Sequence, residues 1–285
     1  MYGAHELIWQ SRSFKSIVNM NRWSGKVAVV TGASAGIGAS VAEKLLQEGL
    51  NVVGIARRKD RILESVKNSG EQNGKLYAVQ ADLTKQEEII QVFDWINKNV
   101  GPVSILVNNA GIVRKTNLVN GDIEGWKKIL DTNVLAVAIA SREAIKSMQE
   151  NKIDGHIINI NSMATNQVPK IPYNNVYPPS KFAVTALSET LRNELITIGS
   201  KIKVSSINPG YTRPDLIEVN GIPEFQLVRQ LLEMVPSLKA EDIANAVVYV
   251  LGTPPMVQVT ELTVMPLGES MINIRDILNY RRKFR

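Results

Sequence analysis

Short runs of apolar residues alternate along this chain with longer stretches in which apolar positions recur every three to four residues. The short runs predict buried strands, and the longer stretches predict amphipathic helices. Because the two kinds of segment alternate, we expect an α/β fold, a doubly wound parallel sheet of about seven strands with helices on both faces. The predicted strands are 27–30, 51–56, 75–80, 104–107, 156–162, 201–207 and 257–264.

Each predicted helix has an apolar face that can cover the sheet. The first follows the strand at 27–30 and carries Ile37, Val41, Leu45 and Leu46 on one side. Further helices are expected at 85–99 and 242–251. The longest pattern covers 121–150, and its candidate core or interface positions are Trp126, Ile129, Leu130, Val134, Val137 and Ile145. Asn133 interrupts this pattern, and a mid-helix amide is either neutral at the surface or retained for a purpose.

A glycine-rich turn joins the first predicted strand to the first predicted helix. Gly32, Gly36 and Gly38 allow the backbone to turn tightly and to approach a pyrophosphate at the positive end of that helix. Their spacing is Gly-x-x-x-Gly-x-Gly, which differs from the Gly-x-Gly-x-x-Gly of the general dinucleotide fingerprint. Taken alone, the turn also fits a simple tight connection.

The end of the second predicted strand indicates which nucleotide is preferred. An enzyme that prefers NAD places an acid there for the ribose hydroxyls, but this chain has Ala56, followed by Arg57, Arg58 and Lys59. Guanidinium donors suit a phosphate dianion, so the pattern favours NADP(H). The alternative is that these charges only form the solvated start of a helix that runs to Asn68.

Tyr177 and Lys181 are four residues apart, and therefore share one face of a predicted helix. A phenol has a reference pKa of about 10, and we expect the neighbouring ammonium to lower the pKa of Tyr177. Ser162, at the end of the fifth predicted strand, can donate a hydrogen bond to a substrate oxygen. A Tyr-x-x-x-Lys pair alone is common by chance, so its weight depends on the other motifs.

Those motifs occur in a familiar order. Thr31 precedes the glycine turn, Asn108-Asn109-Ala110-Gly111 follows the fourth predicted strand, and Asn133, Ser162, Tyr177 and Lys181 come after it. From Arg22 to about Leu267 the chain resembles the classical short-chain dehydrogenase/reductases, which implies a Rossmann fold. Residues 155–163 and 183–187 are most similar to a branch with insect farnesol dehydrogenase-like enzymes and a vertebrate relative that acts on keto- and hydroxysteroids.

The resemblance assigns roles to particular residues. In the direction of reduction, Tyr177 would be the general acid, Ser162 would orient and polarise the carbonyl, Lys181 would tune Tyr177, and Asn133 would kink its helix and hold a water of a proton relay. The implied cofactor is NADP(H). Its binding residues would be Gly32, Ser34, Gly36, Ile37, Gly38, Arg57, Arg58, Asp82, Leu83, Asn109, Ala110, Gly111, Tyr177, Lys181, Pro209, Gly210 and Thr212.

Asp82 has a second interpretation beside its implied role at the adenine amino group. Thr84 and Glu87 have the spacing of a capping box for the helix at 85–99, and Asp82 could serve the same turn. Both roles are compatible.

The chain departs from the family pattern at three prolines. Pro178 and Pro179 replace small residues after Tyr177, and because proline is tolerated only in the first turn of a helix, the helix start could be shifted or loosened. Pro214 stands where the family has a threonine, and we expect Thr212 to compensate.

The family places a mobile lid near residues 211–238, and this segment is rich in apolar residues. Together with Val168, Ile171 and Tyr173, it suggests an apolar alcohol or carbonyl substrate; ordinary packing against the sheet is the alternative.

Composition limits the remaining possibilities. The 285 residues suit one domain at 22–285 after an N-terminal extension at 1–21 that we expect to be flexible, and the net charge is +6. The chain has no cysteine and only two histidines, so thiol chemistry is excluded and a metal centre is not expected. The longest apolar run, 134–140, is far shorter than the roughly 20 residues that span a bilayer. We expect a cytoplasmic protein, with organelle targeting by the extension left open.

Two other function classes stay open. One is a non-catalytic NADPH-binding or scaffold protein that retains the fold, because fold does not determine function. The other is nucleic-acid binding through the basic tail at 280–285, although a solvated chain end explains this tail better. No nucleic-acid partner is predicted, and the resemblance implies a homodimer or homotetramer formed through the helices around Asn133 and Lys181.

Overall fold

The computed structural model describes residues 19–67, 72–114, 116–165, 167–168, 175–213 and 236–268. Within them lies one seven-stranded parallel sheet with the strand order β3-β2-β1-β4-β5-β6-β7. The strands are β1 (Val27–Thr31), β2 (Asn51–Ala56), β3 (Leu76–Gln80), β4 (Val103–Asn108), β5 (His156–Ile160), β6 (Lys203–Pro209) and β7 (Glu261–Val264). The order reverses between β1 and β4, so the predicted doubly wound sheet is confirmed.

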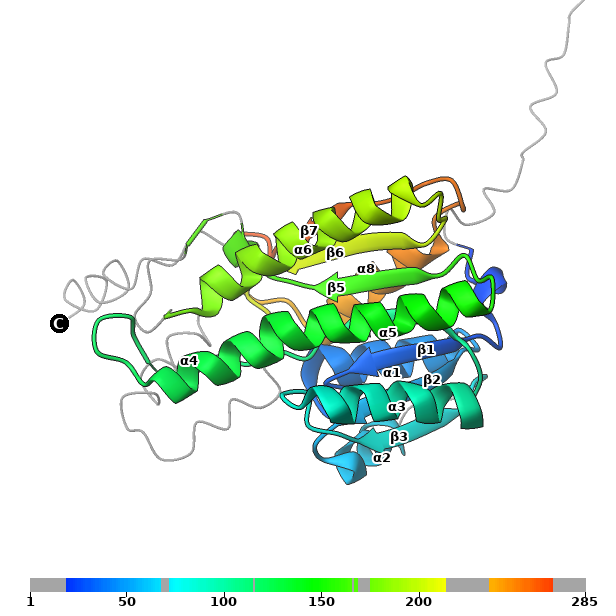
Figure 1. Ribbon diagram of the computed structural model, residues 1–285, viewed down its shortest axis with the longest axis horizontal. Helices are drawn as coiled ribbons and strands as arrows, with labels where there is room; N and C mark the ends of the chain where they lie inside the picture. Colours follow the sequence, from blue (N-terminus) through cyan, green and yellow to red (C-terminus); the bar gives the residue numbers. More distant parts are fainter. Residues whose placement is uncertain are drawn as a thin grey trace, which may run out of the picture.

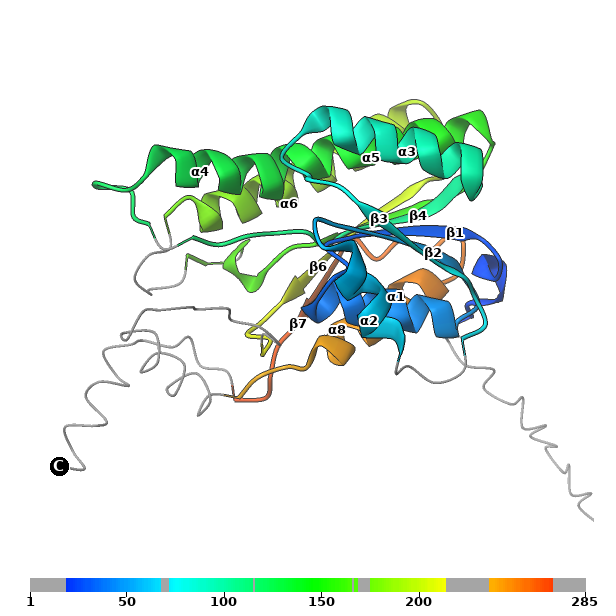
Figure 2. The ribbon, with the colours of Figure 1, turned by 90° about the horizontal axis from the view of Figure 1, so that it is seen from below.

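Helices cover both faces of the sheet (Figures 1 and 2). One layer contains α1 (Gly36–Gln47), α2 (Lys59–Lys67) and α8 (Ala240–Gly252), and the other contains α3 (Gln86–Asn99), α5 (Ala136–Glu150) and α6 (Tyr177–Thr197). The predicted long helix is α4 (Ile123–Leu130), a π-helical turn at Asp131–Leu135, and α5, joined end to end. Short 3₁₀ turns lie at Asn21–Trp23 and Met163–Thr165.

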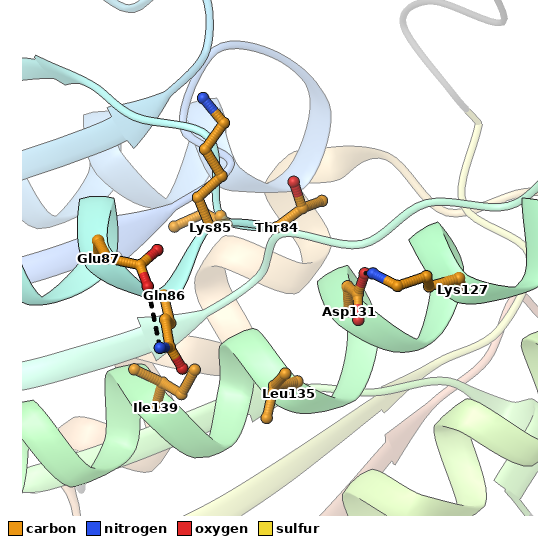
Figure 3. Close-up of a pocket in the computed structure, with 9 residues that line it drawn as sticks. Thr84, Lys85, Gln86, Glu87, Lys127, Asp131, Leu135 and Ile139 are labelled. Carbon is orange, nitrogen blue, oxygen red and sulfur yellow. Dashed lines mark hydrogen bonds and ion pairs between the residues drawn. The ribbon is translucent and has the colours of Figure 1, made fainter. Parts of the chain in front are cut away.

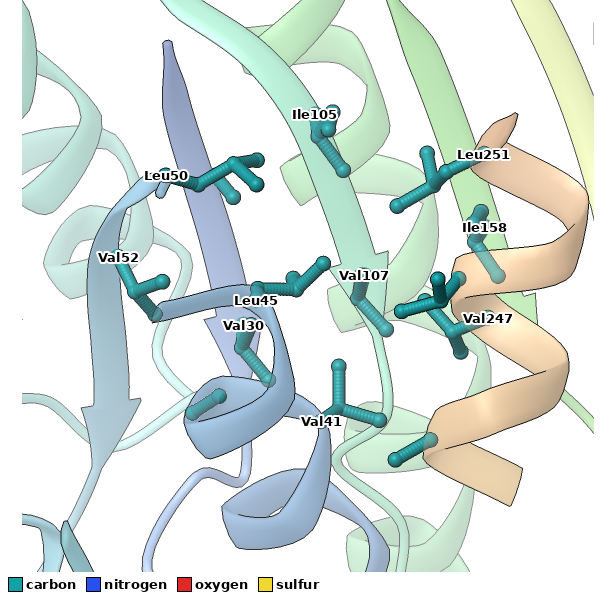
Figure 4. Close-up of a cluster of buried hydrophobic side chains, with 14 of the residues drawn as sticks. Val30, Val41, Leu45, Leu50, Val52, Ile105, Val107, Ile158, Val247 and Leu251 are labelled. Atoms are coloured by element: carbon teal, nitrogen blue, oxygen red, sulfur yellow. The ribbon is translucent and has the colours of Figure 1, made fainter. Parts of the chain in front are cut away.

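The central strands β1, β2 and β4 are almost entirely buried because helices cover both faces of the sheet there. Val30 of β1 packs with Val41 and Leu45 of α1 and with Val247 of α8 (Figure 4). Its neighbour Val29 points to the opposite face and joins the cluster formed with α3 and α5, which includes Phe93. This alternation, repeated in the central strands, produces one apolar core on each side of the sheet.

The packed body of the protein includes residues that the sequence assigns to the N-terminal extension. The amide of Asn19 donates to the carbonyl of Gly252 at 3.1 Å, and Met20 is buried. Residues 1–18 lie outside the described part of the chain.

Several predicted boundaries are wrong by a few residues, and β7 shows why. Its predicted start at 257 is four residues early, because the carbonyls of Val257 and Val259 accept from the side chains of Lys203 and Ser205. These two carbonyls are bonded to side chains of β6, so residues 257–259 do not join the backbone hydrogen-bond ladder between β6 and β7. Likewise β6 occupies 203–209 instead of 201–207, β5 ends at Ile160 before Ser162, and α8 begins two residues earlier than predicted.

No helix in the described ranges is long and apolar enough to span a membrane.

Candidate active site

The glycine turn leaves the start of α1 open. Gly32 and Gly36 have φ values of 69° and 57°, which favour glycine. A Cβ on Gly32 would lie 2.9 Å from Cα of Ala110, and one on Gly38 would collide with the carbonyl of Gly32, whereas one on Gly36 would meet no atom within 4 Å. The N-cap residue, Ala35, offers no side-chain cap to the first amides of α1. An open, uncapped helix start beside close-packed glycines fits an anionic phosphate group.

Ile37 and Ser34 contribute to this turn in different ways. The side chain of Ile37 packs against the core on the α1 side of the sheet, so any contact it makes with a ligand would involve its backbone. Ser34 is partly exposed in the turn between β1 and α1.

Thr31 ties the glycine turn to the Asn-Asn-Ala-Gly segment, a role that the sequence reasoning did not assign. Its hydroxyl oxygen accepts from the amides of Asn109 and Ala110, both at 3.0 Å. The amide side chain of Asn109 in turn donates to the carbonyl of Thr31 at 3.0 Å. The preceding Asn108 donates to Asn159 of β5 at 2.9 Å, so an asparagine side chain bridges the neighbouring strands β4 and β5. The one feature of the sequence that could have indicated this role is the position of Thr31 directly before Gly32.

The ends of β2 and β3 bring the predicted adenosine-side residues together. Arg57 and Arg58 are exposed directly after β2, and Asp82 and Leu83 follow β3. Because β2 and β3 are paired, Asp82 lies near Arg57; hydrogen bonds from Thr84, with a smaller contribution from Arg57, lower the pKa of Asp82.

The predicted Thr84–Glu87 capping box does not form. Thr84 instead donates from both its amide and its hydroxyl to Asp82, at 3.0 and 2.8 Å, and Glu88 accepts from the amide of Asp82 at 2.7 Å. The glutamate that bonds back to this turn is therefore Glu88, one residue after the expected Glu87, and Asp82 accepts hydrogen bonds within the turn as anticipated.

Asn133 is buried in the π-helical turn, and its amide group clamps the segment that follows Gly111. It accepts from the amide of Ile112 at 2.8 Å and donates to the carbonyl of Ile112 at 3.0 Å. It also donates to the hydroxyl of Ser180 in α6 at 3.1 Å. The amide therefore has partners from two elements, and the expected irregularity of this helix is present as the π turn.

Ser162, Tyr177 and Lys181 meet at the carboxyl ends of β5 and β6. The hydroxyl of Ser162 lies beside the phenol of Tyr177 and acts to lower its pKa, and Lys181 Nζ lies 5.8 Å from the centre of the Tyr177 ring. Lys181 is buried and donates to the carbonyl of Ile160 at 3.1 Å. A side chain on Gly111 would approach Asn133 Oδ1 and Lys181 Nζ, at 3.6 and 3.8 Å, so the four predicted residues surround one place in the fold.

The predicted direction of the Tyr177 pKa is wrong for the protein alone. Desolvation of the phenol raises this pKa, and the neighbouring Ser162 hydroxyl only partly opposes the rise. Burial also lowers the pKa of Lys181 to about 8. Both shifts have one cause, because a low-dielectric site disfavours whichever form carries charge.

The three prolines have different outcomes. α6 begins at Tyr177 itself, with Pro178 and Pro179 in its first turn, so the helix start is not displaced. The amide of Gly210 donates to Val264 at 2.7 Å, and the Thr212 hydroxyl donates to the carbonyl of Gly210 at 3.2 Å. Pro209 ends β6 beside them. Pro214 lies outside the described residues, as do 214–235 of the predicted lid and both Ile171 and Tyr173; Val168 is exposed.

A hollow of about 250 Å³ lies beside Leu83, between the first turn of α3 and the α4–α5 region (Figure 3). Its polar side chains are paired with each other, Lys127 with Asp131 at 2.8 Å and Gln86 with Glu87 at 2.9 Å. Asn133, Ser162, Tyr177 and Lys181 do not line it. The hollow is therefore separate from the candidate catalytic residues.

Comparison with known proteins places the whole arrangement in one family. The short chain dehydrogenase model matches residues 26–222. A farnesol dehydrogenase from Aedes aegypti is 47% identical over 253 residues, covering 88% of this chain and 99% of the relative. Dehydrogenase/reductase SDR family member 11 from Gallus gallus is 43% identical over 250 residues, covering 87% of this chain and 98% of the relative.

A solved structure agrees with this result. A short chain dehydrogenase from Burkholderia cenocepacia in complex with NADP superposes with a TM-score of 0.73 at 30% identity, covering 86% of this chain and 98% of that one. Fold, motif positions and sequence identity therefore converge, and the chain belongs to the short-chain dehydrogenase family of oxidoreductases.

Proposed function

We propose that this protein uses NADP(H) to transfer a hydride between the nicotinamide and an apolar alcohol or carbonyl carbon. The observation that carries the proposal is that Ser162 lies beside the Tyr177 phenol, with the buried Lys181 ammonium 5.8 Å from the centre of the same ring. A phenol, a hydroxyl and a buried ammonium at one point are the groups needed to move a proton to or from a substrate oxygen. NADP(H), when bound, would supply or accept the hydride.

The cofactor would lie along the carboxyl ends of β1 to β6. Gly32, Ser34, Gly36, Ile37 and Gly38 would hold the pyrophosphate at the open start of α1, and Asp82 and Leu83 would contact the adenine. Asn109, Ala110 and Gly111 would form the floor below it, and Pro209, Gly210 and Thr212 would contact the nicotinamide amide. The complex of the Burkholderia cenocepacia relative with NADP supports this choice of ligand class.

Arg57 and Arg58 would make the cofactor NADP(H) instead of NAD(H). Both side chains are exposed at the end of β2, where the ribose phosphate would lie, and Asp82 is turned to Thr84. Exposed guanidinium groups at this position suit a phosphate dianion.

In the reducing direction Tyr177 would donate its proton to the carbonyl oxygen. Its raised pKa keeps the phenol protonated at neutral pH, and Ser162 would orient and polarise the carbonyl. Lys181 would favour the charged form of Tyr177 during proton transfer and bind the ribose hydroxyls. Asn133 would complete the relay through the Ile112 backbone that it already holds.

We propose an isoprenoid alcohol such as farnesol, or a steroid-like compound, as the substrate. The 47% identity to a farnesol dehydrogenase supports this class. Val168, a few residues after Ser162 in the sequence, is an exposed apolar side chain that such a substrate could contact.

The competing hypothesis is a non-catalytic NADPH-binding protein, and its one sequence argument is weakened. Pro178 and Pro179 fall at helix positions whose amides have no partner within the helix, so they do not displace Tyr177.

We also propose that the protein is a homodimer or homotetramer. Leu130, Leu135 and Phe182, on the helices around Asn133 and Lys181, are exposed apolar residues that a second copy could cover. Light scattering on the full chain would give the molecular mass.

The test is cofactor titration followed by NADPH absorbance with isoprenoid alcohols and aldehydes, ketosteroids and small diketones. Wild type is compared with Tyr177→Phe and with Tyr249→Phe, a matched control on the exposed surface of α8. We expect turnover with NADP(H), little with NAD(H), and loss only in Tyr177→Phe. Tight NADPH binding without turnover on any substrate would favour the non-catalytic hypothesis, and absence of nucleotide binding would contradict both.

A further inference from the structure

Asn175, two residues before Tyr177, is a buried amide in an uncommon backbone conformation. It is 7% exposed, and its φ of 41° lies in the left-handed region that non-glycine residues rarely adopt. Asparagine tolerates this conformation better than most residues, but a buried one is retained there by specific partners.

The side chain of Asn175 joins two segments of the site. Its carbonyl oxygen accepts from the backbone amide of Tyr177 at 3.1 Å. Its amide nitrogen donates to the carbonyl of Arg114 at 2.8 Å and to that of Thr116 at 3.3 Å. One planar group therefore links the start of α6 to the chain that follows Gly111.

The first turn of α6 explains why this bond falls on Tyr177. A helix is normally capped by a side chain that accepts from the second or third helical amide, but those positions are Pro178 and Pro179, which have no N–H. The N-cap residue, Val176, makes no side-chain cap, and the amide of Ser180 is already bonded to Val176 at 2.9 Å. Of the backbone amides in this first turn, the one of Tyr177 still needs an acceptor, and the side chain of Asn175 provides it.

The same segment after Gly111 is held from its other side by Asn133. Asn133 bonds both the amide and the carbonyl of Ile112 and also reaches Ser180. Two asparagines from different elements thus fix this segment and the first turn of α6 against each other. Tyr177 lies in that turn, so its backbone position depends on both.

We propose that Asn175 is a positioning residue that fixes Tyr177 by capping the proline-containing start of α6 and anchoring it to Arg114 and Thr116. The inference rests on the proposed function, because it assigns a purpose to the placement of Tyr177. Asn175 itself acts through the backbone of Tyr177.

Two variants separate the two halves of this clamp. Asn175→Gly keeps the left-handed backbone without strain and removes every side-chain bond. Asn175→Asp keeps the acceptor for Tyr177 but turns a carboxylate oxygen towards the carbonyls of Arg114 and Thr116. Because small misplacements of a reacting group are costly, we expect kcat to fall about tenfold or more in both variants, while the KM for NADPH changes less than about twofold.

Hydrogen exchange provides a readout that does not require turnover. The peptide 176–181 contains two prolines, so its exchangeable amides are those of Val176, Tyr177, Ser180 and Lys181. Loss of the cap should speed exchange at Tyr177 about tenfold or more in Asn175→Gly, and less in Asn175→Asp, which keeps the acceptor.

Matched controls exclude general effects of the substitutions. Lys152→Gly changes another non-glycine residue of positive φ, 55°, in an exposed turn, and Asn151→Asp removes a similar amide donor, the one bonded to Ser147 at 2.8 Å. Both should leave kcat and exchange at Tyr177 unchanged.

Wild-type kcat and wild-type exchange in Asn175→Gly would overturn the proposal, and wild-type kcat in Asn175→Asp would overturn the anchoring to Arg114 and Thr116. If wild type has no turnover at all, the proposed function fails, and exchange at Tyr177 alone decides whether the clamp exists.

Discussion

Lys181 and Lys203 are both buried, at opposite ends of the same sheet, but they differ in how their ammonium groups are used. Burial lowers the pKa of each to about 8. Lys203, at the start of β6, donates to Val257 at 2.8 Å, Thr253 at 3.2 Å and Pro254 at 3.4 Å. Lys181 has a single hydrogen bond among the described residues, to Ile160. An ammonium has three donors, so Lys203 is saturated and Lys181 is not.

The comparison teaches that the shifted pKa does not identify the functional lysine. Loss of hydration is the main cause of both shifts, and the charge of Arg22 adds to the shift of Lys203. Unused donor capacity beside an aromatic ring distinguishes Lys181, since a ligand can complete its hydrogen bonds. The ammonium of Lys203 is bonded to oxygen atoms just after the carboxyl end of α8, where the helix dipole favours a cation.

The largest expected effect separates these two lysines. Lys181→Met should lower kcat on the order of 10²-fold or more with little loss of stability, because the removed ammonium has one bond in the protein. Lys203→Met should retain kcat when folded but lower the free energy of unfolding by about 1–3 kcal/mol, because it leaves buried acceptors without a donor. Steady-state kinetics and urea unfolding on both variants measure this; equal kinetic losses would contradict the distinction.

The amino end of the sheet should also control stability at acid pH. His156 is fully buried, bonded to Ser205 at 2.8 Å, and burial together with Lys203 and Arg22 lowers its pKa to about 3. Since the unfolded chain binds a proton near pH 6.5 and the folded one near pH 3, stability is present above pH 6.5 and falls as the pH drops through this window. The loss from pH 7.5 to pH 5 should be about 2 kcal/mol. In His156→Gln, the free energy of unfolding measured with urea should change less between pH 7.5 and pH 5 than in wild type. An identical pH dependence would refute the role of His156.

Two glycines at opposite ends of the sheet make a matched pair. Gly36 and Gly199 both have positive φ, 57° and 67°, and a Cβ on either would meet no atom within 4 Å. Alanine at each should cost a similar strain of about 1–2 kcal/mol. Gly36→Ala should in addition weaken NADPH binding about tenfold, because the methyl group would occupy the space proposed for the pyrophosphate. Equal affinities by calorimetry would place the phosphate elsewhere.

The smallest expected effect concerns the arginines. Arg57→Ala with Arg58→Ala should weaken NADPH about fivefold and leave NADH unchanged, since exposed ion pairs contribute about 1 kcal/mol. Arg22→Ala, which removes a 2.7 Å bond to Leu251 at the amino end, is the control and should leave both affinities unchanged. Fluorescence titration with the two nucleotides measures the difference.

The local sequence pattern was sufficient to predict much of the fold and several residues of the site. β2 occupies the predicted residues 51–56, and α6 places Tyr177 and Lys181 on one face as their spacing implies. These features depend on neighbours in the chain, which the sequence displays directly. The start of β7 was missed because the carbonyls of Val257 and Val259 accept from the side chains of Lys203 and Ser205, which are remote in the sequence.

The order of motifs and the residue types at the site were determined by the sequence. The tertiary structure alone decided their environments. Desolvation in the folded protein raises the pKa of Tyr177, Thr31 bonds Asn109 and Ala110 because β1 and β4 are adjacent, and Asn175 reaches Arg114 across 61 positions of sequence. Burial and long-range hydrogen bonding arise from packing among segments that are remote along the chain, so periodicity and spacing carry no record of them.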